Sequence, residues 1–171
     1  MQETLVKEKE AVENGTELKG GKFLSFFLGE EEYAIEILKV QEIIGLMPIT
    51  PVPKMPSYIR GVLNLRGKIV PVMNLRLRFG LQAVEDTDET CVIVVQDRQY
   101  LMGVLVDKVS EVADIMDAQI EEVPSFGVAA NSDYLAGIGK VKESVKMIVD
   151  VHKVVFEVAE EVDAPKHKEE Q

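Results

Sequence analysis

The residues that could act as nucleophiles or metal ligands are few in this sequence. The single cysteine, Cys91, lies in the apolar run Thr-Cys-Val-Ile-Val-Val, and a cysteine in such a strand is far more often a small core residue than a nucleophile. The two histidines, His152 and His167, have no second histidine or cysteine at ligand spacing. The sequence therefore predicts neither a thiol-based active site nor a transition-metal centre.

The motifs for calcium and nucleotide binding are incomplete. The segment Asp86-Thr-Asp88 lacks the glycine and the closing glutamate of a calcium loop, which favours a solvated linker. Gly137-Ile-Gly139 lacks the third glycine of a dinucleotide site, and Gly139-Lys140 lacks Walker spacing. There is no Gly-x-Ser-x-Gly segment, and no pair of carboxylates stands out. We therefore expect no enzymatic activity, no cofactor and no bound metal.

Two residues have the character of protein contacts. Arg66 follows an apolar strand at a predicted hairpin tip, where a planar guanidinium suits an ion pair with a carboxylate. The more ordinary alternative is a solvated turn arginine. Phe126 lies in the loop-like segment Pro124-Ser-Phe-Gly-Val-Ala-Ala, where an aromatic ring is either a contact anchor or a satellite core residue under the loop. These two residues indicate protein binding and not catalysis.

The charge distribution limits the classes of partner. The net charge is −11, which argues against a general nucleic-acid binder, and residues 1–20 and 157–171 together supply −6 of it. Residues 43–84 contain no acid, and their bases either form a face for an acidic partner or are a solvated chance cluster. An aromatic content of 6% without tryptophan offers no stacking platform for bases. The six bases are Lys54, Arg60, Arg66, Lys68, Arg76 and Arg78.

Hydropathy and cysteine usage indicate the cytoplasm and no direct membrane contact. The N-terminal residues lack an apolar export segment, and no apolar run is long enough to span a bilayer. One cysteine excludes an internal disulfide.

The sequence predicts a mainly β chain. Residues 1–20 are expected to be a mobile charged tail. Gly67 suits a turn that requires positive φ, and the prolines at 48, 51, 53 and 56 indicate an edge strand or an extended loop. Residues 38–44 are ambiguous between helix and strand, and residues 74–79 favour a short helical turn. Strands are expected at 23–28, 33–37, 62–65, 69–73, 91–95, 100–106, 120–123 and 145–149.

The last element has helical periodicity. Valines recur at positions 151, 154, 155, 158 and 162, directly after Asp150, which is a suitable cap. This spacing predicts a C-terminal amphipathic helix despite the β-branched side chains.

The second half of the chain echoes the first. Lys39-Val-Gln-Glu matches Lys108-Val-Ser-Glu, and Tyr58-Ile-Arg-Gly-Val matches Tyr134-Leu-Ala-Gly-Ile in the same order. Both tyrosine segments precede a turn and an apolar strand, which we pair as Ile69-Val-Pro-Val-Met and Met147-Ile-Val-Asp-Val. Matched order and spacing predict two copies of one unit of about five strands, the size of a small closed barrel.

The globular region resembles the CheW family of bacterial chemotaxis coupling proteins. The resemblance extends from Lys22 to Val155, and the most specific stretch is Arg60-Gly-Val-Leu-Asn-Leu-Arg-Gly-Lys-Ile-Val-Pro. It implies two intertwined five-stranded SH3-like β-barrel subdomains with a C-terminal α-helix. The expected organisation is a flexible tail at 1–20, a CheW-like domain at 21–156 with subdomains at about 22–80 and 90–150, and the helix end with an acidic tail at 157–171.

The resemblance also implies site residues. Glu42 and Arg66 match a pair expected to form a salt bridge, while Asn74 departs from the aspartate that is frequent at its position. Positions tied to receptor or kinase coupling are matched by Val40, Glu42, Gly61 and Arg66, and positions tied to kinase contact by Phe126, Val109 and Val112. Burial is an alternative explanation for the last two valines.

The implied function is that of an adaptor. Family members link the cytoplasmic tips of methyl-accepting chemoreceptors to the regulatory domain of the histidine kinase CheA in cytoplasmic arrays, and the free protein is expected to be a monomer. A coupling module within a larger signalling protein is disfavoured, because the residues after Val162 are tail-like. The alternative from another class is a small β-barrel that binds nucleic acid or a small ligand.

Overall fold

The computed structural model describes residues 18–124 and 134–155, and within these ranges the chain is mainly β. Short helical segments are η1 (Ile37–Lys39), α2 (Leu75–Arg78), η2 (Asp117–Gln119) and residues 151–155. The strands are β1 (Gly21–Leu28), β2 (Glu31–Glu36), β3 (Val40–Gly45), β4 (Ile59–Leu65), β5 (Lys68–Asn74), β6 (Cys91–Asp97), β7 (Tyr100–Val106), β8 (Lys108–Ile115), β9 (Ile120–Glu121), β10 (Leu135–Val141) and β11 (Ser144–Val149).

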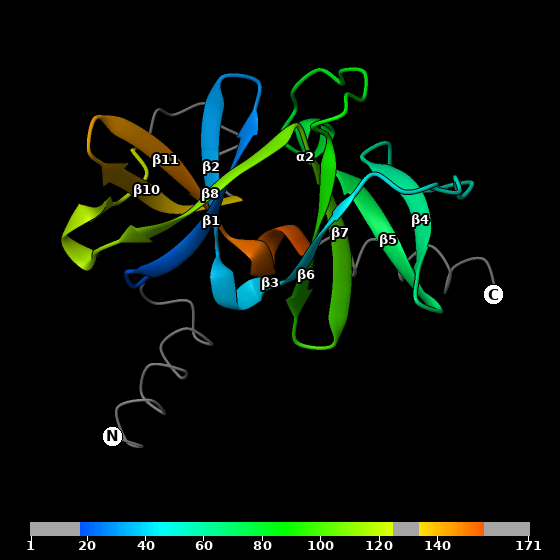
Figure 1. The fold of residues 1–171 in the computed structure, drawn as a ribbon, viewed down its shortest axis with the longest axis horizontal. Helices are drawn as coiled ribbons and strands as arrows, with labels where there is room; N and C mark the ends of the chain where they lie inside the picture. The colour runs from blue at the N-terminus through cyan, green and yellow to red at the C-terminus, as the bar shows by residue number, and fades with distance from the viewer. Residues whose placement is uncertain (1–17, 125–133, 156–171) are drawn as a thin grey trace.

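The described strands form two sheets, and each sheet takes strands from both halves of the chain. One sheet has six strands in the order β8-β1-β2-β11-β10-β9, and the other has five in the order β3-β6-β7-β5-β4. The hairpin β1–β2 therefore lies in the sheet built mainly by the second half, while the hairpin β6–β7 lies in the sheet built by the first. Figure 1 shows the two sheets side by side with the helix of residues 151–155 between them.

The predicted duplication is visible in the pairing register. Ala34 of β2 pairs in parallel with Ile148 of β11, and Gly103 of β7 pairs in parallel with Val72 of β5. Taken in order, the strands of the first half are therefore equivalent to strands of the second half: β1, β2, β3, β4 and β5 correspond to β6, β7, β8, β10 and β11. The carbonyl of Tyr58 accepts a hydrogen bond from the Asn74 amide at 2.7 Å, and that of Tyr134 accepts one from the Asp150 amide at the same distance.

This register corrects one of the predicted echoes. Because Tyr58 is equivalent to Tyr134 and Asn74 to Asp150, Ile69 is equivalent to Val145, and the match to Met147 was wrong by two residues. Two residues is one full period of a strand, so the alternation of inward and outward side chains was unchanged by the error.

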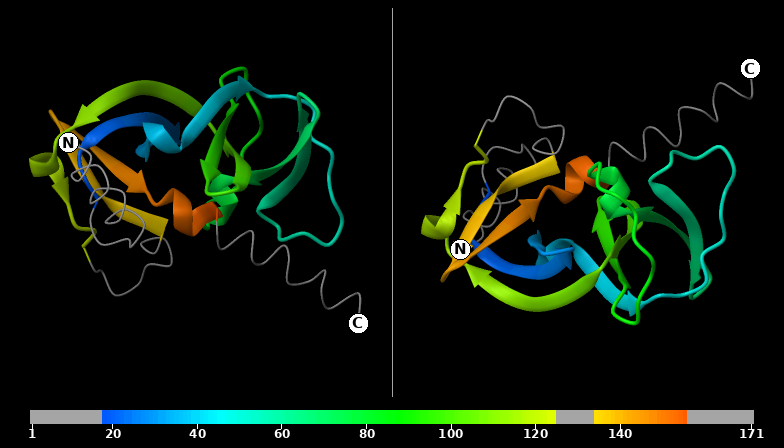
Figure 2. Two further views of the ribbon diagram at one scale, coloured as in Figure 1. Left: turned by 90° about the horizontal axis from the view of Figure 1, so that it is seen from below. Right: turned by 90° about the horizontal axis from the view of Figure 1, so that it is seen from above.

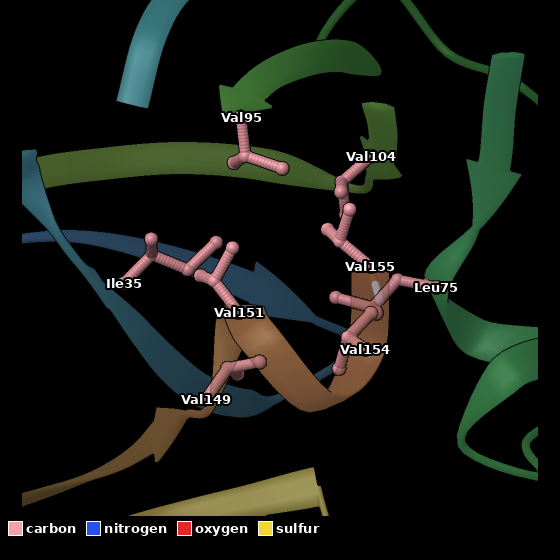
Figure 3. Close-up of a pocket in the computed structure, with 8 residues that line it drawn as sticks. All are labelled: Ile35, Leu75, Val95, Val104, Val149, Val151, Val154 and Val155. Atoms are coloured by element: carbon pink, nitrogen blue, oxygen red, sulfur yellow. The ribbon is translucent and has the colours of Figure 1, made fainter. Parts of the chain in front are cut away.

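A shared apolar core holds the two sheets together. It contains Phe26 and Ile35 from the six-stranded sheet, Ile93 and Val104 from the five-stranded sheet, and the valines of residues 151–155. Figure 3 shows the helix valines directed toward side chains from both sheets around a small apolar cavity. Two smaller clusters fill the interiors of the separate subdomains. Both views of Figure 2 place the helix at the junction.

Aromatic rings reinforce this junction. The guanidinium of Arg78 lies between the rings of Tyr58 and Tyr134, 4.6 and 4.7 Å from their centroids. Such cation–π contacts strengthen when the cation is desolvated, and Arg78 is buried. Because the two tyrosines precede equivalent strands of different sheets, one arginine contacts both subdomains.

The predicted fold class is confirmed, with differences in detail. The structure is mainly β with two intertwined subdomains, but the sheets have six and five strands because the two-residue strand β9 adds to one edge. The C-terminal helix begins after Asp150, whose carboxylate accepts from the Lys153 amide at 3.2 Å. Its first three valines are buried, and positions 158 and 162 lie outside the described residues. Within residues 74–79, Leu75–Arg78 form the short helix α2, which Asn74 caps.

Removing buried volume at the junction should destabilise both subdomains together. Leu75 on α2 is fully buried and lines the cavity between the sheets. Leu75→Ala is expected to lower the free energy of unfolding by about 2–5 kcal/mol, because transfer and cavity terms add. The matched control Ile69→Ala, at a side chain that is 64% exposed, should change it by less than about 0.5 kcal/mol. Urea denaturation checks both values, and equal small effects would contradict the shared core.

An ion pair near the junction should make stability depend on pH. The Asp107 carboxylate accepts hydrogen bonds from Arg76 Nε at 2.9 Å and from the Gly29 amide at 2.7 Å. Bonding to Arg76 holds the pKa of Asp107 below its ordinary value, so the stabilisation is present above the unfolded pKa and is lost as pH falls through the folded pKa.

The comparison of wild type with Asp107→Asn isolates this carboxylate. The variant is expected to be less stable at neutral pH, and the difference should shrink between about pH 5 and pH 3 as the wild-type carboxylate is protonated. Chemical denaturation across this range measures it, and a pH-independent difference would refute the assignment.

Candidate functional site

The ion pair between Glu42 and Arg66 joins the two edges of the five-stranded sheet. Glu42 lies on edge strand β3, and Arg66 lies in the turn after β4, the opposite edge. The guanidinium donates through both terminal nitrogens to the two carboxylate oxygens, with Nη1 3.3 Å from Oε2. The contact links the opposite edges of the sheet, and the predicted salt bridge is confirmed.

The turn holds Arg66 in a fixed position while leaving it open to solvent. Arg66 and Gly67 both have positive φ, 52° and 88°, and the Gly67 amide donates to Asn64 Oδ1 at 2.8 Å. The side chain of Arg66 is 70% exposed and that of Glu42 is 24% exposed. A bidentate pair of this kind presents a charged, oriented surface, whereas its contribution to stability is small.

Gly61 allows an extended segment to lie against β4. Its φ is 151°, and a Cβ atom would lie 2.2 Å from the Thr50 carbonyl oxygen. Thr50 and Val62 exchange two backbone hydrogen bonds of 2.8 and 2.9 Å, which anchor the proline-rich segment as predicted. The backbone conformation and the close approach both require glycine here.

The valines of the predicted site occupy equivalent positions on two strands. Val40 on β3 and Val109 on β8 each precede a β-bulge and pack, half-buried, against the shared core. Val112 on β8 is 53% exposed. The structure therefore brings Glu42 and Arg66 into contact, with Val40 on the same strand and Gly61 on β4. It sets Val109 and Val112 on the other sheet, and Phe126 lies outside the described residues.

Most of the bases between 43 and 84 are engaged within the molecule. Arg60 forms a two-pronged ion pair with Asp86, Arg66 pairs with Glu42, and Arg76 pairs with Asp107. Arg78 is buried between two tyrosine rings. The acid-free stretch is therefore neutralised largely by acids outside it. The prediction that Asp86-Thr-Asp88 is a solvated linker was incomplete, since Arg60 binds the Asp86 carboxylate.

The described residues offer few groups suited to catalysis. They contain no cluster of histidine, cysteine, aspartate and glutamate suited to a metal ion. Burial raises the pKa of the half-buried Cys91 thiol, so the reactive thiolate is disfavoured. The described helices include none long and apolar enough to cross a membrane.

A set of polar contacts around a buried carboxylate at the junction was not predicted from the sequence. The Asp97 carboxylate lies 2.6 Å from His152 Nδ1 and 3.3 Å from Lys39 Nζ. It joins the end of β6 to the C-terminal helix and to η1. The sequence offered little signal for it, because the three residues are widely separated along the chain.

Replacing Gly61 should loosen the segment that contains Thr50. Gly61→Ala is expected to lower the unfolding free energy by more than about 1 kcal/mol, because the native φ and the contact with Thr50 exclude a Cβ atom. Gly45→Ala is the matched control, since Gly45 ends β3 with an ordinary φ and open space around a Cβ. Urea denaturation and hydrogen exchange of the Thr50 and Val62 amides measure the effect. Equal stability of both variants would contradict it.

Comparison with known proteins identifies relatives across nearly the whole globular region. The family model described as CheW-like domain matches residues 22–158. A protein from Klebsiella aerogenes named "Chemotaxis protein CheW" is 43% identical over 139 residues, covering 81% of this chain and 84% of that protein. A protein of the same name from Helicobacter pylori is 36% identical over 134 residues, covering 78% and 81% of the two chains.

A solved structure has the same architecture. The crystal structure titled as the scaffolding protein TtCheW from Thermoanaerobacter tengcongensis superposes with a TM-score of 0.73 at 32% identity, covering 81% of this chain and 90% of that one. The family match, the identities above 30% and the common fold agree. This chain belongs to the CheW-like domain family.

Proposed function

We propose that this protein is a non-catalytic coupling protein that links the cytoplasmic tips of chemoreceptors to the histidine kinase CheA through protein contacts. The observation that carries the proposal is the exposed, bidentate Arg66–Glu42 pair on a rigid turn. Relatives named as chemotaxis proteins and a structural neighbour titled as a scaffolding protein support it.

The coupling surface consists of Val40, Glu42, Gly61 and Arg66 on the five-stranded subdomain. The ion pair holds a guanidinium edge and a carboxylate in a fixed relation, which suits a partner with complementary charges. Gly61 contributes by fixing the neighbouring extended segment. Kinase contact is assigned to Val109, Val112 and Phe126, and the exposed side chain of Val112 is accessible for it.

The protein acts in the cytoplasm at receptor arrays and is a monomer when free. A nucleic-acid or small-ligand function is disfavoured, because at least four of the six bases between residues 43 and 84 are engaged within the molecule. The small cavity at the junction has a wholly apolar lining, without the polar groups that orient a ligand.

Arg66 variants test the proposal. Arg66→Lys should impair receptor-dependent activation of CheA, because an ammonium group does not reproduce the planar fork. Arg66→Glu should abolish activation while changing the unfolding free energy by no more than about 1 kcal/mol, since the Arg66 side chain is largely exposed. The measurements are kinase activity in reconstituted receptor arrays and pull-down with receptor fragment and CheA.

Arg98→Glu is the matched control. Arg98 is also a turn arginine of positive φ, 57°, but it lies outside the proposed surface. This variant should retain activation. Full activation by folded Arg66→Glu protein would remove Arg66 from the functional surface.

A further inference from the structure

A lysine is buried inside the six-stranded subdomain together with its partners. The side chain of Lys146 on β11 is 2% exposed, and its ammonium lies 2.6 Å from Glu32 Oε2 and 3.3 Å from Ser25 Oγ. The Ser25 hydroxyl donates to the same Glu32 oxygen at 2.7 Å. A longer contact of 3.4 Å joins Lys146 to Glu111, which is largely exposed. We call Ser25, Glu32 and Lys146 the polar core cluster.

The equivalent positions in the other subdomain are all apolar. Ser25 pairs with Ala34 and Val94 pairs with Gly103, which makes Val94 equivalent to Ser25. By the same register Leu101 is equivalent to Glu32. The third equivalence is Val70 with Lys146. Val70 and Val94 are buried in the interior cluster of the five-stranded subdomain, and Leu101 packs against it. The two interiors therefore differ in polarity at the same three sites.

The members of the cluster come from different halves of the chain. Ser25 and Glu32 lie on the β1–β2 hairpin of the first half, whereas Lys146 lies on β11 of the second. Each half inserts its hairpin into the strands of the other half. The cluster therefore forms when unlike halves pair.

Pairing of like halves between two molecules is the competing arrangement. Because the halves are equivalent in topology, the β1–β2 hairpin of one chain could insert beside β3, β4 and β5 of a second chain. Glu32 and Ser25 would then face Val70 without a cation. In the corresponding pairing of second halves, Lys146 would face Val94 and Leu101 and keep only its contact with Glu111. A buried charge without its partner is strongly disfavoured.

We propose that the polar core cluster selects the pairing of unlike halves and so keeps the protein a monomer, by excluding association of like halves between two copies of the chain. The apolar interior of the five-stranded subdomain does not make this distinction, since Val70, Val94 and Leu101 accept any apolar hairpin. The polar residues therefore act on specificity, a role that single buried polar groups also have in coiled coils.

Cysteine reporters distinguish the two kinds of pairing. Lys22 on β1 is opposite Asp114 on β8, and both side chains are exposed. Lys22 is equivalent to Cys91, which is opposite Gly45. In a Cys91→Ala chain carrying Lys22→Cys, Asp114→Cys and Gly45→Cys, the native arrangement brings together cysteines 22 and 114. Pairing of like halves instead brings together cysteines 22 and 45 of two different chains.

The test is refolding of this reporter chain at high concentration in a glutathione redox buffer, followed by peptide mapping and light scattering. With the polar core cluster intact, the 22–114 disulfide and the monomer are expected. The triple variant Ser25→Val, Glu32→Leu, Lys146→Val should raise the share of the interchain 22–45 disulfide by at least about tenfold, in proportion to protein concentration. Lys146→Met alone should do the same, because it removes the cation that the hairpin recognises.

Val70→Ala is the matched control, since it destabilises the other interior without changing its polarity. It should lower stability and leave the disulfide distribution unchanged. If both the triple variant and Lys146→Met refold with the 22–114 disulfide and no rise in the 22–45 product, the proposal is wrong. An equal rise in Val70→Ala would also overturn it, because general destabilisation would then explain the result.

Discussion

The shortness of two connections determines the architecture of this protein. Three residues, Ile37–Lys39, join β2 to β3, and a single residue, Asp107, joins β7 to the equivalent strand β8. In each sheet, the strand next to the first strand of the hairpin runs parallel to the second strand of that hairpin. A connection between two parallel strands of one sheet needs about a dozen residues. The strands β3 and β8 are therefore unable to take the place beside the first strand of their own hairpin. Each continues into the other sheet, and the two halves exchange hairpins.

The shared core follows from this exchange. Because each sheet contains strands from both halves, neither subdomain is complete without the other, and the apolar faces of Ile35 and Val104 pack against the same C-terminal helix (Figure 3). Two of the proposed coupling residues, Val40 and Glu42, lie on β3, directly after the connection between the sheets. A contact at Val40 or Glu42 is therefore made on backbone that pairs with β6 and is fixed by the packing of Val40 against the shared core, which suits an adaptor that acts through fixed geometry.

Local features were predictable from the sequence, and non-local pairing was not. The turn at Gly67, the helical turn after Asn74 and the cap at Asp150 depend on residues close in sequence, and the structure confirms them. The hairpin exchange depends on which strands meet across the chain, and alternation within a strand does not encode its neighbour. The Glu42–Arg66 pair came from the family resemblance. The buried Lys146 interrupts the inward-facing apolar positions of its strand, a signal that was available and was missed.

Two equivalent carboxylates differ between the halves in the cation that each contacts. Glu42 and Glu111 occupy equivalent positions at the bulges of β3 and β8. Glu42 meets a cation on the surface turn, Arg66, whereas Glu111 contacts a cation whose charge is directed into the core, Lys146. The turn residue equivalent to Arg66 is Lys142, with a similar φ of 58°, but its compact ammonium lacks the planar fork. The duplication thus places similar charged residues at equivalent positions of the two subdomains. In one the charged pair lies on the surface, and in the other the cation lies inside the fold.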